Sequence, residues 1–196
     1  MASAFSHAVI ATALGKTILP RESPRWTWAL GAVLAAVPDL DVVGFHFGIR
    51  YGDTFGHRGF THSFFFAAVV AAFLAVALQR RPRVSGRRLF GFFFLALASH
   101  GLADALTNGG LGIAFFAPFS NARYFFPFRP VAVSPIGLER FFSSRGREVL
   151  RSEAVWLILP SFLVFGVATI LRGTDRRPRK NPTTKYEANP CPPSSL

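Results

Sequence analysis

The 196-residue chain contains histidine and aspartate residues whose types and positions suit the binding of a metal ion. His100 and Asp104 stand four residues apart in "SHGLADALT", so a helix would place both side chains on one face. An imidazole and a carboxylate one helical turn apart can bind the same cation. The alternative for this pair alone is a buried His–Asp hydrogen bond that stabilises helix packing.

Two further aspartates and one histidine adjoin other apolar segments. Asp39 and Asp41 follow an apolar run in "AAVPDLDVVG", where Pro38 should end or bend the preceding helix. Taken alone, these carboxylates are better explained as part of a solvated turn or as a helix cap than as metal ligands. His7 lies one turn into the first apolar stretch and, taken alone, fits a core histidine.

The stretch "FGHRGFTHSFFF" places two histidines and an arginine at the start of an apolar run. His57 and His62 are candidate metal ligands. Arg58 between them, with Arg123 and Arg129 further along, is a candidate for binding an anionic substrate, because a guanidinium matches the geometry of phosphate. The alternative for these arginines is pairing with lipid headgroups.

The composition indicates a membrane protein and limits the kinds of metal site. The chain is 51% hydrophobic and 16% charged, with 23 phenylalanines and a formal net charge of +12. The arginines cluster in short loops beside apolar runs, which is typical of membrane topology and argues against specific binding of nucleic acid. Because Cys191 is the single cysteine, a metal would have to be held by histidine and carboxylate.

Apolar segments that could position these residues recur along the chain. Three are close to the roughly 20 residues that cross a bilayer, and we predict them to span it: 62–79, 89–107 and 154–171. Two shorter stretches, 2–19 and 26–37, are predicted as short or tilted helices. The predicted fold is therefore an all-α polytopic membrane protein of about five helices, two short and three full spans, around the His/Asp cluster.

We predict one membrane-embedded helical domain over 1–172 and a disordered, basic, Pro-rich tail over 173–196. The aromatic and Pro-rich segment 108–152 is too irregular for a span, and we predict an ordered loop at the bilayer surface.

The positive-inside rule predicts the orientation of these elements. The basic loop 80–88 and the start of the tail should be cytoplasmic, which places the N-terminus outside. Four helices then bring their His and Asp residues to the outer side of the membrane. The outer segment 108–152 carries six arginines, but the rule weakens for long loops.

Several imidazoles with carboxylates and no sulfur describe a site for zinc, with manganese or iron as alternatives. The candidate ligands outnumber those that one tetrahedral zinc requires, so we predict two or three ions. Such clusters suit hydrolysis of phosphoesters. Asp41 would be a further ligand or the catalytic base for a metal-activated water.

Five motifs, in this order, resemble those of the bacterial membrane-bound metal-dependent hydrolase family, the YdjM-like inner-membrane proteins. They are "FSHAVIATALG", "VPDLD", "HRGFTHS", "SHGLADALTNGG" and "APFSNARYFFPF". The resemblance covers roughly residues 1–135. It implies a distant similarity to zinc-dependent phospholipase C and to the single-strand-specific zinc nucleases, which are all-helical enzymes that hold three zinc ions with histidine and aspartate.

The resemblance implies a set of metal ligands, although the chain has one His-x-x-x-Asp pair where the soluble enzymes use two. His100 and Asp104 match that pair, and Asp39 matches an aspartate after a proline. His7 matches a ligand near the N-terminus, and the remaining ligands are those of the central motif, His57 and His62.

Two functions remain open at this point. The first is a membrane-embedded metal-dependent hydrolase at the outer face of the bacterial inner membrane, which would cleave an ester or phosphoester, including that of a phospholipid. The second is a non-enzymatic membrane protein, a cation or proton transporter or a stress-response scaffold, with a structural metal site.

Overall fold

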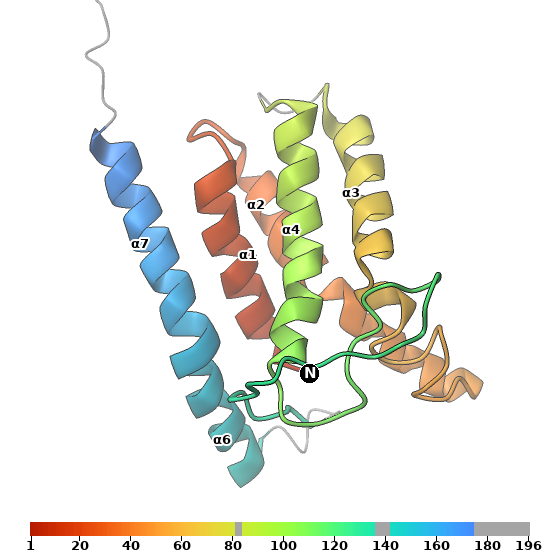
Figure 1. Ribbon diagram of the computed structural model, residues 1–196. Coiled ribbons are helices and arrows are strands. Elements are labelled where there is room, and N and C mark those ends of the chain that lie inside the picture. Colours follow the sequence, from red (N-terminus) through yellow and green to blue (C-terminus); the bar gives the residue numbers. More distant parts are fainter. Residues whose placement is uncertain (81–83, 136–141, 175–196) are drawn as a thin grey trace, which may run out of the picture.

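The computed structural model describes residues 1–80, 84–135 and 142–174 (Figure 1). In these ranges the chain forms helices, turns and loops, with two isolated β-bridges and no strand. The elements are α1 (Ala4–Ile18), α2 (Arg25–Leu34), η1 (Val37–Phe47), η2 (Phe60–His62), α3 (Phe64–Leu78), α4 (Gly86–Ala105), α6 (Ser144–Glu153), η3 (Ala154–Ile158) and α7 (Leu159–Thr174). The all-helical part of the prediction is confirmed.

Of the predicted tail 173–196, residues 175–196 lie outside the described residues, whereas 173 and 174 are the last residues of α7. Residues 81–83 of the predicted basic loop also lie outside the described residues.

Helix α4 lies at the centre of the bundle and packs against α1, α2 and α3 (Figure 1). Phe92 of α4 is fully buried and lies over Gly31 of α2, where a Cβ atom would come within 2.2 Å of the ring. On its other side α4 meets a row of small residues on α3, Ala67, Ala71 and Ala75. Small residues allow close approach of two helices, as in membrane bundles.

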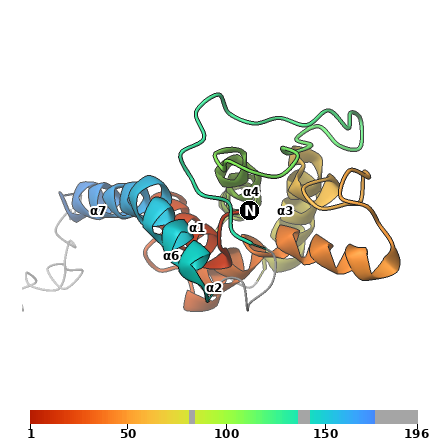
Figure 2. The same cartoon turned by 90° about the horizontal axis from the view of Figure 1, so that it is seen from below.

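Helix α7 lies at the edge of the bundle and packs along α1 (Figure 2). The continuous apolar helix Ser144–Gly173 is 30 residues long, and only 17% of its most apolar window is buried inside the protein. Large side chains such as Phe162, Leu163 and Ile170 point outward. An apolar surface of this extent suits contact with lipid.

Among the described residues, two helices are long and apolar enough to cross a membrane, Arg25–Phe47 and Ser144–Gly173. The helix Arg25–Phe47 is longer than the short helix predicted at 26–37, because η1 follows α2 almost directly. Figure 1 shows, however, that η1 runs in a different direction from α2, with Pro38 at the bend.

The other two predicted spans are less clear in the structure than in the sequence. Helix α3 has 15 residues, or roughly 22 Å, against a hydrocarbon core of roughly 30 Å. Helix α4 has 20 residues, but arginines at its start and His100 and Asp104 near its end lower its hydropathy. The polytopic architecture is therefore supported only in part.

We predicted a loop over the whole of segment 108–152. The structure differs, because helix α6 occupies the end of this segment. The side chain of Ser143 accepts a hydrogen bond from Arg145 N–H at the start of α6, and Arg145 forms an ion pair of 2.7 Å with Glu148. A π-turn, η3, joins α6 to α7 just before Pro160. The sequence did not reveal α6 because its residues are mostly polar.

One end of the bundle gathers the elements that carry the candidate ligands. The start of α1, the helix η1, the turn η2 and the end of α4 meet there, with the loop 108–135 around them (Figures 1 and 2). The loop is ordered by backbone hydrogen bonds in both directions between Ile113 and Tyr124, and by one from Asn108 N–H to Val131 O.

Candidate metal centre

Four buried side chains converge at this end of the bundle: Asp39 from η1, His62 from η2, and His100 and Asp104 from α4. Each offers one ligand atom, and the four atoms lie within 4.8 Å of one another. Nε2 of His62 and Nε2 of His100 are 3.0 Å apart, and Asp39 Oδ1 is 3.3 Å from His100 Nε2. The structure thus brings together four of the six predicted ligands.

Local sequence explains how these side chains are presented. Pro38 stands at the first turn of η1 and fixes the backbone that carries Asp39. Ser63 is the N-cap of α3, where its hydroxyl accepts a hydrogen bond from Phe66 N–H, so that His62 lies directly before the helix. His100 and Asp104 share one face of α4, as their spacing predicted.

The partners of both imidazoles leave Nε2 directed at the cluster. His100 Nδ1 lies 2.7 Å from the carbonyl oxygen of Ala35, which can only accept, so this nitrogen carries the proton. The Thr61 hydroxyl donates to Asp41 Oδ2 at 2.8 Å and can accept from His62 Nδ1 at 3.0 Å. Both Nε2 atoms then offer lone pairs, and protein metal sites commonly fix histidine ligands in this way.

Two nitrogen lone pairs that face each other at 3.0 Å repel unless a cation lies between them. The simplest such cation is a proton on one of the two nitrogens. Burial disfavours a charged imidazole, but the nearby carboxylates of Asp39 and Asp41 outweigh it and raise the pKa of His62 to about 9. His62 lies before α3, outside the helices that could span a membrane. In the absence of a metal, His62 therefore carries the cluster's extra proton at neutral pH.

The carboxylates also point unpaired atoms into the cluster. Both oxygens of Asp39 and Oδ2 of Asp104 are buried and have no hydrogen-bond partner among the described residues. Unpaired buried oxygens are costly and call for a partner. Two imidazole nitrogens and two carboxylates are donors that suit zinc, manganese or iron, so the residues present fit a divalent ion.

His7 lies beside this group without belonging to it. Its ring stacks on His100, with 3.8 Å between ring centroids, and its Nε2 lies 3.6 Å from Asp104 Oδ1. Neither ring nitrogen of His7 has a hydrogen-bond partner in the described part of the chain. His7 is thus placed to contact Asp104, and its role as a ligand stays a prediction.

Asp41 and His57 form a second group that shares His62. Asp41 Oδ1 lies 2.6 Å from His57 Nδ1, and Oδ2 accepts hydrogen bonds from the Thr61 hydroxyl and from Arg58 N–H. Both oxygens of Asp41 therefore have protein partners, unlike those of Asp39.

Arg58, predicted to contact substrate, is instead fully buried. Its guanidinium donates to the carbonyl oxygen of Gly109 at 2.7 Å and to the Thr107 hydroxyl at 3.0 Å. Its Nε lies 3.4 Å from Asp104 Oδ2. The side chain therefore faces the metal-ligand cluster from inside the protein.

The other two predicted substrate arginines differ from each other. Arg123 donates to the backbone carbonyls of His57, Tyr51 and Asp53, and so joins the loop 108–135 to the loop before α3. Burial lowers the pKa of Arg123 and raises that of Tyr51. Arg129 is exposed and lies over the ring of Phe125, 4.8 Å from its centroid. Of the three, Arg129 is the one open to an external anion.

The cluster is nearly closed to the outside. The side chain of Asp39 is 9% exposed, that of Asp41 is 3% exposed, and those of His62, His100 and Asp104 are inaccessible. Large pockets of about 340–720 Å³ lie elsewhere on the described part of the chain, and none of these five is lined by a residue of the cluster. Asp39 is therefore the point at which the cluster comes nearest to the surface.

Sequence reasoning missed a buried carboxylate that positions α1. Glu153 of α6 accepts hydrogen bonds from Ser3 N–H, the Ser3 hydroxyl and the Ser6 hydroxyl at 2.5–2.7 Å. A carboxylate at a helix N-terminus is favoured by the helix dipole. Glu153 thus fixes the first turn of the helix that carries His7. The available signal was a lone acid directly before an apolar run.

Helices with a lipid-suited surface and a buried His/Asp cluster define a class: membrane proteins with a site that can bind a metal ion. The comparisons with known proteins narrow this further. The family described as YdjM inner membrane protein matches residues 1–174, so the chain belongs to that family.

A curated relative agrees with this assignment. The chain is 39% identical over 171 residues to the inner membrane protein YbcI of Escherichia coli (strain K12), covering 85% of this chain and 96% of that protein. No solved structure matches the chain. The predicted family is confirmed, and the family and the relative both support a location in the inner membrane.

Proposed function

We propose that this protein is a membrane-bound, metal-dependent hydrolase that cleaves an ester or phosphoester at the outer face of the inner membrane. The observation that carries the proposal is the convergence of four buried side chains with N and O donor atoms, in which three carboxylate oxygens lack a hydrogen-bond partner among the described residues. A divalent ion held there would supply Lewis-acid chemistry, by polarising a phosphoryl or carbonyl oxygen and activating water. Zinc, manganese and iron all fit these donors.

In this proposal each residue of the cluster has a distinct task. Asp39, His62, His100 and Asp104 bind the ion, and Asp39 faces the side from which substrate arrives. Asp41 orients the rings of His57 and His62 through their Nδ1 atoms, because both of its oxygens already have protein partners. We therefore assign Asp41 to positioning, in place of the general base expected from the sequence.

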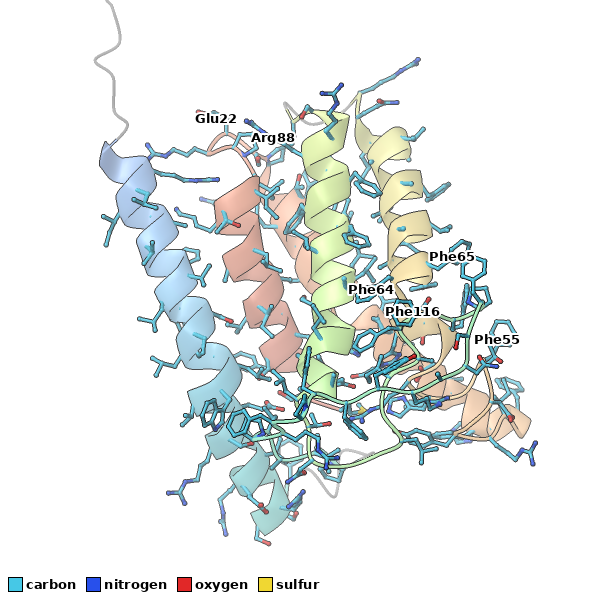
Figure 3. All side chains as sticks on the ribbon, viewed as in Figure 1. Glu22, Phe55, Phe64, Phe65, Arg88 and Phe116 are labelled. Atoms are coloured by element: carbon cyan, nitrogen blue, oxygen red, sulfur yellow. The ribbon has the colours of Figure 1, made fainter. Side chains whose placement is uncertain are left out.

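The surroundings support an amphiphilic, anionic substrate. Arg129 offers an exposed guanidinium on the loop 108–135. Phe119, Phe55 and Phe47 are 80%, 65% and 79% exposed at the same end of the molecule, and Figure 3 shows Phe55 there, opposite the end that carries Glu22 and Arg88. Exposed aromatic rings of this kind favour the interface between lipid and water. A phospholipid, with its phosphoester at that interface, meets both requirements.

The test is hydrolysis by the metal-loaded full chain in detergent or nanodiscs, with phospholipids and soluble phosphodiesters as substrates. His100→Ala should lose turnover and bound metal together. The matched control is His46→Ala, because His46 is exposed on η1 and belongs to neither group of candidate ligands. An enzyme that hydrolyses equally well with His100→Ala, or a metal-loaded protein that turns over no ester, would remove the hydrolase proposal.

The near closure of the cluster favours a second candidate, a non-enzymatic membrane protein with a structural metal. Structural sites are closed, whereas catalytic sites keep an open position. In that case metal removal should lower the melting temperature strongly while no ester is cleaved at any metal loading. Thermal unfolding of metal-loaded and metal-stripped protein, measured beside the hydrolysis assay, separates the two candidates.

A further inference from the structure

Arg58 is the largest fully buried side chain of the described residues. The guanidinium of arginine carries a permanent positive charge in proteins. Burying such a charge is expensive unless it is paired and hydrogen-bonded. The place where the fold has put this charge is therefore informative.

Several features hold the guanidinium of Arg58 in one position. Gly109 O and the Thr107 hydroxyl accept its two terminal N–H groups. The backbone of Arg58 has a φ of 63°, a left-handed conformation that is unusual for a residue with a side chain. At Gly110 a Cβ atom would lie 2.7 Å from Arg58 Nη1, so the absence of a side chain there gives the guanidinium its room.

The side chain is directed at the cluster of metal ligands. Its Nε has no hydrogen-bond partner among the described residues, and it lies 3.4 Å from Asp104 Oδ2. The same oxygen is 3.9 Å from both His62 Nε2 and His100 Nε2. Arg58 and a bound ion would thus share the carboxylate of Asp104.

The buried charges indicate how many ions can be accommodated. With neutral imidazoles, the carboxylates of Asp39, Asp41 and Asp104 and the guanidinium of Arg58 have a formal charge of −2 over these four side chains. The amino group of Met1 and the carboxylate of Glu153 also lie near the cluster, and their opposite formal charges leave this sum unchanged. One divalent ion neutralises it. A second would leave an excess of two positive charges beside a fixed cation, which a buried site disfavours.

The ligand atoms that remain available also support a single bound ion. The second group of potential ligands, with Asp41 and His57, needs Nδ1 of His62, which faces the Thr61 hydroxyl and Asp41. Both oxygens of Asp41 are also engaged. One set of atoms, that around Asp39, therefore remains free for a cation.

We propose that Arg58 is a built-in cation of this centre, so that the cluster holds one divalent ion instead of two or three. The proposal rests on the metal centre of the proposed function and adds the number of ions and the positioning role of Arg58. Arg58 fixes Asp104 and limits the affinity of the site through its charge.

The experiment is the metal content of the full chain, purified in detergent, stripped with chelator and reloaded with Zn²⁺ or Mn²⁺. The His46→Ala background removes an exposed histidine that could bind metal adventitiously. We expect one ion per chain by mass spectrometry of the metal. In the same background, Arg58→Gln should bind that ion about tenfold or more tightly in chelator competition, because a nearby repulsive charge is lost. Arg58→Lys keeps the charge and should stay close to the parent.

The outcomes separate this inference from the proposed function. Two or more tightly held ions per chain would overturn the single-ion inference and leave a hydrolase possible. No tightly held ion would overturn both. Unchanged or weaker binding in a folded Arg58→Gln variant would overturn the role of Arg58 as a limiting charge. If that variant fails to fold, the ion count of the parent protein still decides.

Discussion

The two histidines of the cluster link the binding of a metal ion to the protonation of a single ring nitrogen. Nε2 of His62 and Nε2 of His100 face each other at 3.0 Å, and each ring has a partner at Nδ1. A metal ion bound by both rings would therefore compete with a proton for the same place between them. Metal ligands must be deprotonated, so binding at such a site is linked to pH.

The first residue-scale prediction concerns this competition. The pKa of His62 is raised to about 9 in the metal-free protein, so below that pH the ion must displace a proton. Metal affinity should then fall by about tenfold for each pH unit below 9. Calorimetry in buffers of different ionisation enthalpy should show about one proton released per ion at pH 7. Binding without proton release would contradict this arrangement of the two rings.

A second residue-scale prediction concerns the space for Arg58. Gly110→Ala should lower the free energy of unfolding by about 1–3 kcal/mol, because the added Cβ meets Arg58 and Tyr51 and the φ of 89° is unfavourable for alanine. Gly52→Ala is the matched control, since its Cβ would meet nothing within 4 Å. Denaturant unfolding followed by circular dichroism measures both variants, and equal stabilities would show that Gly110 is not needed for room.

At this scale the sequence predicted which side chains lie close together better than it predicted their surroundings. The spacing of His100 and Asp104 and the HRGFTHS motif indicated residues that the structure brings together. The inward orientation of Arg58 was not foreseeable, because it depends on Thr107 and on the backbone of the loop that follows α4. Likewise, a main-chain carbonyl such as Ala35 O leaves no signal in the residue types.

Among the elements, α6 and α1 depend on each other through one carboxylate. Glu153 is fully buried and accepts three hydrogen bonds from Ser3 and Ser6. The two elements are about 150 residues apart in the chain, so no local pattern predicts this pairing. The polar composition of α6 likewise hid a helix that runs directly into α7.

The element-scale prediction follows from that contact. Glu153→Gln should lower the free energy of unfolding by about 1–3 kcal/mol, since a buried charge-assisted network is weakened. Glu148→Gln, on the exposed side of α6 and paired with Arg145, should change it by less than about 1 kcal/mol. Thermal unfolding in detergent compares the two. Similar losses for both variants would show that Glu153 does not fix α1.

The cluster of candidate ligands lies at one end of the helical bundle. At this end loop 108–135 and η1 surround the start of the chain (Figure 2). Composition and hydropathy were sufficient to predict an all-helical membrane protein. They were less informative about spans, because α3 is short and η1 turns away from α2 at Pro38. A hydropathy profile depends only on which residues are present, whereas the length and direction of these helices depend on how they pack.

The whole-molecule prediction concerns the two ends of the bundle. In a Cys191→Ser background, a cysteine introduced by Asn121→Cys, in the loop at the cluster end, should react with a membrane-impermeant maleimide added to intact cells. A cysteine introduced by Glu22→Cys, at the opposite end (Figure 3), should react only after the membrane is opened. The reverse pattern would place the cluster on the cytoplasmic side.

The central claim is that Asp39, His62, His100 and Asp104 form a metal centre, and X-ray absorption spectroscopy of the zinc-loaded protein tests it most directly. We predict a shell of nitrogen and oxygen ligands with scattering from at least two imidazole rings, and the loss of one ring in the His100→Ala variant. A shell of oxygen atoms alone, or a spectrum unchanged by His100→Ala, would contradict it.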